Sequence, residues 1–376
     1  MKKLLLGIAA VCLAGFTFAQ DAPLWMRHSV ISPDGTTIAF TYKGDIYTVP
    51  VAGGRAMQIT TNPAYDTAPV WSPDSKRIAF ASDRMGSLDV YIVAKDGGEP
   101  RRLTTHSGSE TPLAFTDAGH VLFSAGIMPS AEAVVFPSNG QFNQVYRVSV
   151  EGGRPTMISS MPMECISINK EGAMLYQDKK GYEDYWRKHH VSPIARDIWM
   201  YTPGKEPQYR QLTTFGGEDR EPVWAPDGKT FYYLSEENGS FNIYRRTPGD
   251  AKAVQLTHYT KNPVRYLSAA TDGRLCYGFD GEIYTLLPGG EAQKVNISIV
   301  SDRNDKDIIR QIKSSGATEM AVSPDGKEVA FVLRGDVYVT SVEYKTTKQI
   351  TNTPCQERTV DFAPDGRTLV YASERG

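Results

Sequence analysis

The stretch SPDGTTIAFTYKGDIYTVPVAGGRAMQIT, from Ser32 to Thr60, recurs along the chain with its main features kept. Clear copies begin at Trp71, Trp224 and Ser323, and weaker copies at Phe115, Ile168, Ala270 and Ala363. The aspartates or glutamate of the turns lie from 40 to about 56 residues apart in successive copies. A period of this length is typical of one four-stranded blade of a β-propeller.

Each part of the repeat has a physical explanation. In the Pro-Asp-Gly turn the proline presets φ, the aspartate caps the turn and the glycine adopts a positive φ. The apolar run Ile38–Phe40 predicts a buried second strand, and Asp45–Tyr47 begins a third strand. A glycine pair at Gly53 then leads into a fourth strand that ends in Ile-Thr or Leu-Thr. We interpret these residues as turn and core consensus and not as a site.

The repeats predict an all-β fold: a six-bladed β-propeller followed by the first, truncated blades of a second β-propeller. We assign 20–297 to the six-bladed propeller, 298–318 to a connector and 319–376 to the start of the second propeller. The connector is charged and lacks the turn consensus, and a calcium loop there would miss the EF-hand glycine and glutamate. We expect the first propeller to close by side-chain packing between its first and last blades, unless the termini exchange a strand.

The first 19 residues have the pattern of a signal peptide. Lys2 and Lys3 precede the apolar run Leu4–Phe18, and Ala19 offers a small residue for cleavage. We therefore expect export, most simply to a bacterial periplasm, and no membrane span after cleavage. The net charge of −2 argues against a nucleic-acid partner.

The mature chain contains three cysteines, Cys165, Cys276 and Cys355, at scattered positions. We expect buried single thiols, without a disulfide framework, a metal site or a cofactor. The sequence contains no Gly-x-Ser-x-Gly elbow, no His-Glu-x-x-His and no P-loop. We assign no catalytic residue to this chain, and whether it belongs to an enzyme stays open on motifs alone.

Two insertions interrupt the repeat, Gly126–Asn143 in blade three and Lys179–Arg196 in blade four. Both fall between second and third strands, so they share one face of the predicted propeller, and loops on a rigid scaffold commonly carry recognition. The second insertion mixes aromatic and basic side chains. From it we predict peptide-binding or partner-binding residues: Tyr185, Trp186, Arg187, His189, His190 and Arg196.

The alternative for this insertion is a loop packed on its own propeller. A metal site at His189 and His190 is disfavoured, because adjacent side chains on an extended segment diverge.

Several stretches go beyond the general repeat: YRVSVEGG (Tyr146–Gly153), ARDIWMYTPG (Ala195–Gly204) and the segment Ser315–Val339. In these stretches and in its order of blades, the chain resembles the tricorn protease family. The resemblance implies a second propeller of seven blades, followed by PDZ-like and serine-peptidase domains that hold the catalytic serine and histidine. It implies peptides or unfolded protein segments as partners and leaves a homo-oligomer open. Paired arginines that some members place after the second blade are missing from the matching stretch, Ser107–Leu113.

The leading hypothesis is a non-catalytic propeller part of an exported tricorn-like serine protease. In this hypothesis it gates or channels peptides to a C-terminal peptidase domain absent from these residues. The alternative is a TolB-like periplasmic interaction propeller without enzymatic activity. A third, weaker hypothesis is the propeller of a prolyl-oligopeptidase-type enzyme.

Overall fold

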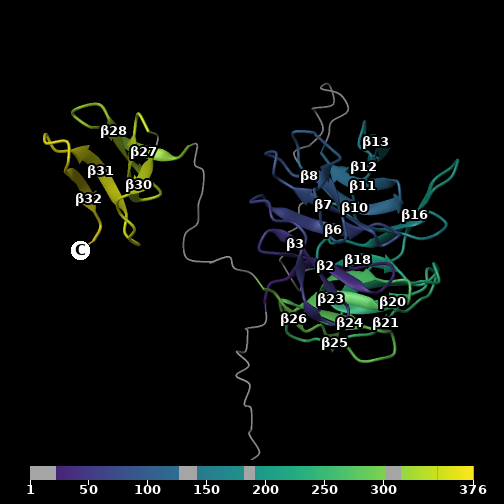
Figure 1. Cartoon of the computed structure of the whole chain (residues 1–376). Helices are drawn as coiled ribbons and strands as arrows, with labels where there is room; N and C mark the ends of the chain where they lie inside the picture. The colour runs from purple at the N-terminus through teal and green to yellow at the C-terminus, as the bar shows by residue number, and fades with distance from the viewer. Residues whose placement is uncertain (1–22, 127–141, 182–190, 301–314, 345, 376) are drawn as a thin grey trace, which may run out of the picture. The chain divides into compact units, whose positions relative to one another are not determined.

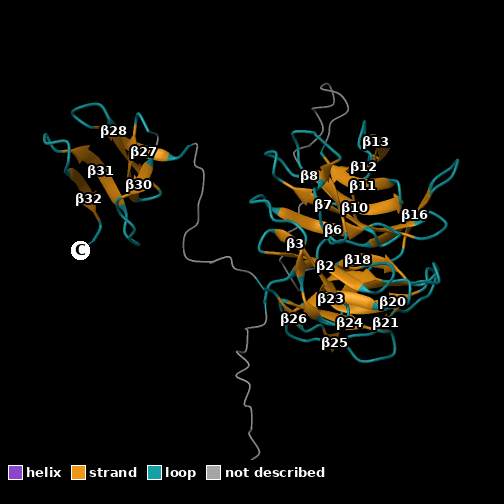
Figure 2. Ribbon diagram, in the orientation of Figure 1, coloured by secondary structure: helices purple, strands orange, loops and turns teal. Residues whose placement is uncertain are grey.

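The structure is a computed structural model that describes residues 23–126, 142–181, 191–300, 315–344 and 346–375. The chain divides into two compact units, Met1–Ser301 and Asp302–Gly376, and each is described by itself. Every regular element in the described residues is a β-strand (Figures 1 and 2). No helix in these ranges is long and apolar enough to span a membrane.

The described residues of the first unit form six four-stranded antiparallel sheets, numbered one to six in chain order. The strands of each sheet follow one another along the chain, so each copy of the repeat makes one sheet. Sheet one contains β1 (Arg27–Ile31), β2 (Thr37–Tyr42), β3 (Asp45–Pro50) and β5 (Met57–Gln58), and sheet two contains β6 (Asp66–Trp71), β7 (Arg77–Ser82), β8 (Asp89–Ala94) and β9 (Arg101–Arg102). Sheet three contains β10 (Glu110–Asp117), β11 (His120–Ala125), β12 (Gln144–Ser149) and β13 (Thr156–Ser159), and sheet four contains β14 (Met163–Ile168), β15 (Met174–Asp178), β16 (Ile198–Thr202) and β17 (Gln208–Gln211). Sheet five contains β18 (Asp219–Trp224), β19 (Phe231–Ser235), β20 (Asn242–Arg246) and β21 (Val254–Gln255), and sheet six contains β22 (Arg265–Ala269), β23 (Leu275–Phe279), β24 (Glu282–Leu286) and β25 (Gln293–Lys294).

The first strand of each sheet contacts the first strand of the next, and β22 of sheet six returns to β1 of sheet one. Six strands therefore form a closed ring, which is the arrangement of a β-propeller. The apolar core lies between neighbouring sheets: Ile46 of sheet one, for example, belongs to the same cluster as Phe80 and Tyr91 of sheet two. The predicted all-β propeller fold is confirmed.

The turn aspartates act as the sequence predicts. The Oδ1 atom of Asp34 accepts the backbone N–H of Thr36 at 3.0 Å, and Asp74, Asp227 and Asp272 accept the equivalent N–H in their own turns. The hydroxyl of Ser72 donates to Asp74 at 2.5 Å and lowers the pKa of that carboxyl. The turn aspartates therefore serve as hydrogen-bond acceptors within their own turns.

The Asp-Ile-Tyr and Ile-Thr segments of the repeat are hydrogen-bond partners. In sheet one the hydroxyl of Thr60 accepts the N–H of Ile46 at 2.9 Å and lies 3.4 Å from the Asp45 carboxylate. The same arrangement recurs in sheet four, where Thr213 accepts the N–H of Ile198. In sheets one, two, four and five the threonine at the end of the repeat therefore caps the third strand of its own sheet.

The tryptophan before the Pro-Asp turn joins neighbouring sheets. The indole N–H of Trp71 in sheet two donates to the carbonyl of Val30 in sheet one at 3.0 Å. Trp224 in sheet five donates to Ala173, next to sheet four, at 3.2 Å. Both tryptophans are buried, as expected for a residue that seals a joint between sheets.

The ring closes by packing and by backbone pairing. Sheets one and six share an apolar cluster, and the short strand β26 (Ile297–Ser298) pairs in parallel with β4 (Gly54–Arg55). Gly53, with a φ of 85°, turns the chain here, and a Cβ atom at this position would lie 2.6 Å from the Asn296 carbonyl oxygen. The predicted side-chain closure is thus supplemented by a short exchange of backbone hydrogen bonds.

The second unit repeats the same structural pattern. One sheet contains β27 (Ala317–Val322), β28 (Glu328–Leu333), β29 (Asp336–Ser341) and β30 (Thr347–Gln349). A second sheet pairs β31 (Glu357–Phe362) with β32 (Leu369–Ser373). Val337 and Val360 belong to the apolar cluster between these two sheets.

Candidate functional site

A β-bulge recurs near the start of the first strands. In five of the six, the residue at the bulge has a left-handed backbone: His28, Ala68, Cys165, Glu221 and Tyr266, with φ between 50° and 57°. Bulges of this kind redirect side chains and increase the local twist. We call these bulge residues and the residues before them, with their counterparts in β10, the axial ring, because their strands surround the propeller axis.

The sixth strand departs from the pattern for a reason written in the sequence. In β10 the equivalent position is Pro112, whose ring fixes φ near −65° and forbids the left-handed conformation. In β10 the shift in strand register therefore lies one residue later, between Pro112 and Ala114.

Charge is distributed unevenly around the axial ring. Sheets two and three contribute the pairs Thr67–Ala68 and Thr111–Pro112, which carry no charge. The other four sheets contribute Arg27–His28, Glu164–Cys165, Arg220–Glu221 and Arg265–Tyr266. One side of the ring is therefore rich in charged and aromatic groups, whereas the other side is small and neutral.

Cys165 shows that solvent reaches the ring. The prediction of buried thiols is confirmed for Cys276, but it is wrong for Cys165, which is exposed, and for Cys355, which is partly exposed; all three are free. Cys165 is exposed because its bulge lies beside the propeller axis and not within the packing between sheets. Loss of hydration beside the protein wall, with the charges of Glu221 and Glu164, raises the pKa of the thiol well above its usual value. The thiol therefore stays protonated at neutral pH.

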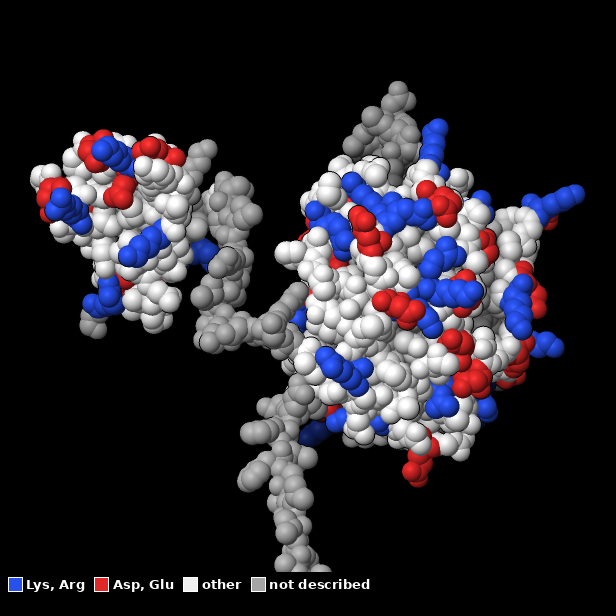
Figure 3. Space-filling model, in the orientation of Figure 1, with Lys and Arg blue, Asp and Glu red and all other residues white. Residues whose placement is uncertain are grey.

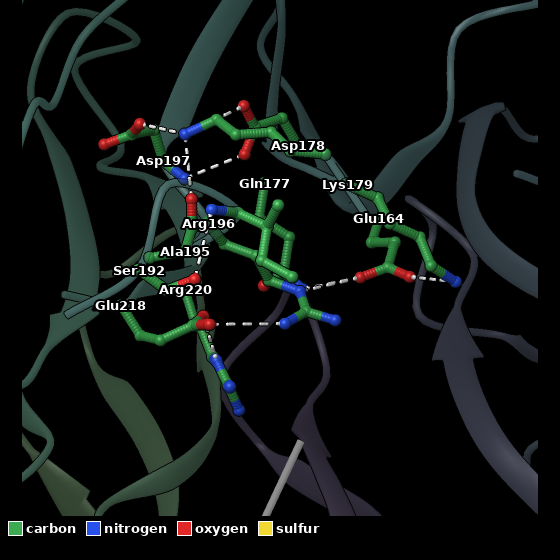
Figure 4. Close-up of polar contacts among 12 residues, drawn as sticks. Glu164, Gln177, Asp178, Lys179, Ser192, Ala195, Arg196, Asp197, Glu218 and Arg220 are labelled. Atoms are coloured by element: carbon green, nitrogen blue, oxygen red, sulfur yellow. Dashed lines mark hydrogen bonds and ion pairs between the residues drawn. The ribbon is translucent and has the colours of Figure 1, made fainter. Parts of the chain in front are cut away.

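A chain of ion pairs supports the charged side of the ring (Figure 4). The Nε atom of Arg196 lies 3.2 Å from Glu164, and its Nη1 lies 3.4 Å from Glu218. Glu218 in turn accepts from Nε of Arg220 at 2.8 Å. Burial alone would raise the pKa of Glu164, but Arg196, the Gln177 amide and Lys179 outweigh it and lower that pKa. Glu164 is accordingly an anion that faces fixed cations.

Hydrogen bonds extend this network across three sheets. The side-chain amide of Gln177 donates to Glu164 at 2.9 Å, while its oxygen accepts the N–H of Glu221 at 3.0 Å. The Glu221 carboxylate then accepts the N–H of Leu267 in sheet six at 2.8 Å. Polar groups on the charged side are thus held in place by partners on neighbouring strands.

On the far side of the same arc, His28 packs against Tyr266 with ring centroids 4.9 Å apart. Burial, with a contribution from the charge of Arg27, lowers the pKa of His28 to about 4. The imidazole is therefore neutral at physiological pH and acts as a packing group against Tyr266.

The predicted binding residues fall on both sides of the described boundary. Tyr185, Trp186, Arg187, His189 and His190 lie outside the described residues, so their role stays a prediction. Arg196 is described, and it is only 5% exposed, because it holds two carboxylates where the insertion ends. In this structure its guanidinium supports the axial ring.

The end of the insertion is fixed by further ion pairs. Lys180 contacts the Asp197 carboxylate and donates to the carbonyl of Ala195 at 2.8 Å, while Lys179 lies 3.4 Å from Glu164. These contacts join the residues on either side of the insertion to β14 and β16.

Sequence reasoning missed the axial ring. Its members occupy the two variable positions at the start of each first strand, immediately before the segment that leads to the Pro-Asp-Gly turn. Aligning the repeats and asking which positions change in charge would have found it.

The axial ring has polar groups suited to binding, and we assign no reaction centre among its described residues. Within the described ranges, no group of three or more His, Cys, Asp or Glu side chains is placed to hold a metal ion. Over the face of the first unit seen in Figure 3, basic and acidic side chains intermingle. Recognition through hydrogen bonds and local charge is what the arrangement supports.

Comparison with known proteins identifies the class. Residues 23–292 match the tricorn protease N-terminal beta propeller domain, and the chain belongs to this family. This family assignment agrees with the propeller fold described above.

Individual relatives support the same assignment. The chain is 26% identical over 289 residues to tricorn protease homolog 1 of Streptomyces coelicolor, which covers 76% of this chain and 26% of that protein. It is 25% identical to the tricorn protease of Thermoplasma acidophilum, over 85% of this chain and 29% of that one. A crystal structure of the tricorn protease superposes with a TM-score of 0.63 at 18% identity, covering 90% of this chain and 32% of that chain. The chain thus spans about a quarter to a third of the length of these relatives.

Proposed function

We propose that this chain is the non-catalytic propeller part of an exported tricorn-like serine protease. Its role would be to gate or channel peptides toward a peptidase domain that lies outside these 376 residues. The family match supports the propeller assignment, and the names of the relatives associate such propellers with proteases. The peptide role is the further step of the proposal.

The observation that carries this step is the axial ring. An extended peptide presents unpaired backbone N–H and C=O groups, which need polar partners when they leave water. The ring places charged groups that are not fully buried, those of Arg27, Glu164 and Arg265, around an axis that solvent reaches at Cys165. Thr67 and Thr111 on the other side of the ring add no charge.

Cys165 provides a direct test. In a Cys12→Ser/Cys355→Ser variant of the 376-residue chain, the two remaining thiols are Cys165, which is exposed, and Cys276, which is buried. Alkylation by iodoacetamide near pH 9, where more of the thiol ionises, should proceed at a measurable rate. Unstructured peptides of about ten residues should slow it several-fold, whereas free amino acids at the same concentration should not. An alkylation rate unaffected by saturating peptide would refute a peptide path through the ring.

The peptidase connection has its own test. The coding region that follows, in frame or adjacent, should encode PDZ-like and serine-peptidase domains. A downstream region without them would favour a TolB-like interaction propeller.

Export is the remaining part of the proposal and depends on residues 1–19. N-terminal sequencing of the protein from a periplasmic extract should begin at Gln20. Recovery of the chain with Met1 intact and in the cytoplasm would overturn it.

A further inference from the structure

The first residue of the first strand is a buried acid in several sheets. It lies at the interface with the preceding sheet, which we call the joint between the two sheets. Asp66, Glu110 and Asp219 hold this position in the first unit, and Glu357 holds it in the second, with each residue at most 1% exposed. A buried carboxylate without a cation is costly, so the groups opposite each acid decide how its joint behaves.

In two of these joints an arginine neutralises the acid. One guanidinium nitrogen of Arg84 donates to both carboxylate oxygens of Asp66 at 3.0 Å. In the second unit, Arg375 lies 3.4 Å from Glu357. Each arginine comes two residues after the serine that pairs with the acid across the sheet, Ser82 for Asp66 and Ser373 for Glu357.

In sheet five the same position carries the opposite charge. Asp219 pairs with Ser235 in the same register, and two residues later the chain has Glu237 in place of an arginine. No ion pair reaches Asp219 from the described residues, and its Oδ1 atom has no hydrogen-bond partner there.

The other groups around Asp219 do not supply a cation. Burial and the charges of Asp197 and Glu237 oppose its ionised form, whereas the neighbouring hydroxyls of Ser235 and Thr213 favour it. Tyr233 and Tyr244 of the same sheet are close enough for the charge on Asp219 to raise their own pKa values.

Nearby cations already have partners. Lys180 is paired with Asp197, and Arg220 and Arg196 are paired with Glu218. The carboxylate of Glu236 is hydrogen-bonded to the N–H of Glu218.

We propose that the joint between sheets four and five is a proton-dependent seam, closed when Asp219 is protonated and loosened when Asp219 ionises. The backbone geometry supports a local effect, because the N–H of Asp219 bonds to the carbonyl of Arg196 at 3.0 Å. Ionisation would also place a negative charge one residue from Arg220 in the axial ring. The seam therefore links proton concentration to the charged side of the ring.

The direction of the pH dependence follows from burial. Burial raises the pKa of Asp219 from 3.8 to about 7, with Asp197 and Glu237 contributing. Because the folded chain binds this proton more tightly than the unfolded chain, the stability of the joint falls as the pH rises from about 4 to about 7. It is constant above that window.

Hydrogen exchange of the whole 376-residue chain tests the seam. Rates corrected for intrinsic pH dependence are compared at pH 5 and pH 8 for residues 213–224 and, as an internal reference, for residues 60–71 at the arginine-closed joint. At a pH above the pKa of Asp219 in the closed joint, each unit by which that pKa exceeds the pKa in the opened joint favours opening by about a factor of ten. We expect residues 213–224 to exchange at least about tenfold faster at pH 8, and residues 60–71 to change by less than about twofold.

Three variants identify the group. Glu237→Arg places a guanidinium where sheet two has Arg84, and Glu237 is exposed, so the change is compatible with folding. It should remove the pH response, whereas the matched control Glu237→Gln should keep most of it; Asp219→Asn should remove it without adding a charge. A wild-type response equal in both segments would overturn the proposal. So would equal behaviour of the two Glu237 variants, or a full response in Asp219→Asn.

Discussion

Sheets two and five come from clear copies of one repeat, yet they treat the same buried acid in opposite ways. In sheet two, Asp66 is held by Arg84, which also lies over the ring of Tyr91 at 4.5 Å. In sheet five, Asp219 has Glu237 at the arginine position and burial raises its pKa to about 7. The backbone register is the same in both sheets. The comparison teaches that the repeat determines the geometry of a joint, whereas one side chain determines its electrostatics.

Removing the arginine from sheet two should have the largest effect. Arg84→Ala leaves Asp66 buried without a cation, and breaking a buried pair in this way costs about 3–5 kcal/mol. The free energy of unfolding from urea denaturation at pH 7 measures the loss. The variant should also acquire a pH dependence like that of sheet five. A loss below about 1 kcal/mol would mean that the arginine is not what closes this joint.

The next largest effect is expected for the threonines that cap the third strands. Thr60→Val and Thr213→Val each remove a buried acceptor from a backbone N–H, of Ile46 and Ile198 respectively. We expect a loss of about 1–3 kcal/mol for each. Thr213 should be at the upper end, because its hydroxyl also favours the ionised form of the buried Asp219. Urea denaturation of the two variants side by side checks the order, and a larger loss for Thr60→Val would contradict it.

Glu110 offers an independent joint without an arginine. Its register partner is Ala125, and the sequence has Ile127 two residues later. Burial, with the charge of Asp89 adding to it, raises the pKa of Glu110 to about 7. Stability at this joint should therefore fall between about pH 4.5 and pH 7, and Glu110→Gln should reduce that fall by about 1–3 kcal/mol. Thermal unfolding across this pH range measures it. An unchanged curve would show that Glu110 does not titrate in the window.

The smallest effect is expected at a surface pair. Arg101 and Glu151 lie 2.7 Å apart, but their side chains are 49% and 74% exposed. Water and salt screen an exposed pair of this kind, so Arg101→Ala should hardly change the free energy of unfolding. It is the matched control for Arg84→Ala, since both remove one paired arginine from sheet two or its edge. An equal loss in the two variants would show that burial does not set the size of the effect.

Much of the fold could be predicted because its signals are local. The Pro-Asp-Gly turn is stabilised by hydrogen bonds between residues two positions apart, as for Asp34 and Thr36. The alternation of strands follows from apolar runs that a single repeat contains. Pro112 shows that even an irregularity can be local, because its fixed φ displaces the bulge in β10.

The site was harder to predict because its members meet only in three dimensions. Arg196 was predicted to contact a ligand from its place in a basic, aromatic insertion, and that role stays a prediction. Its pairing with Glu164 of β14 and with Glu218, just before β18, was visible only in the structure. Cys165 was predicted to be buried by its residue type, yet its strand lies beside the axis and it is exposed. The sequence of a single repeat does not indicate the surroundings of either Arg196 or Cys165.

The sequence by itself determined the repeat, its strands, its turns and the family to which the chain belongs. These follow from short-range hydrogen bonds and from apolar periodicity, both of which act within one copy. Only the tertiary structure decided which acids have a cation, which thiol meets solvent and how the first ring closes at Gly53. The physical reason is that burial and charge pairing depend on groups from neighbouring sheets, and closing the ring is what brings those groups together.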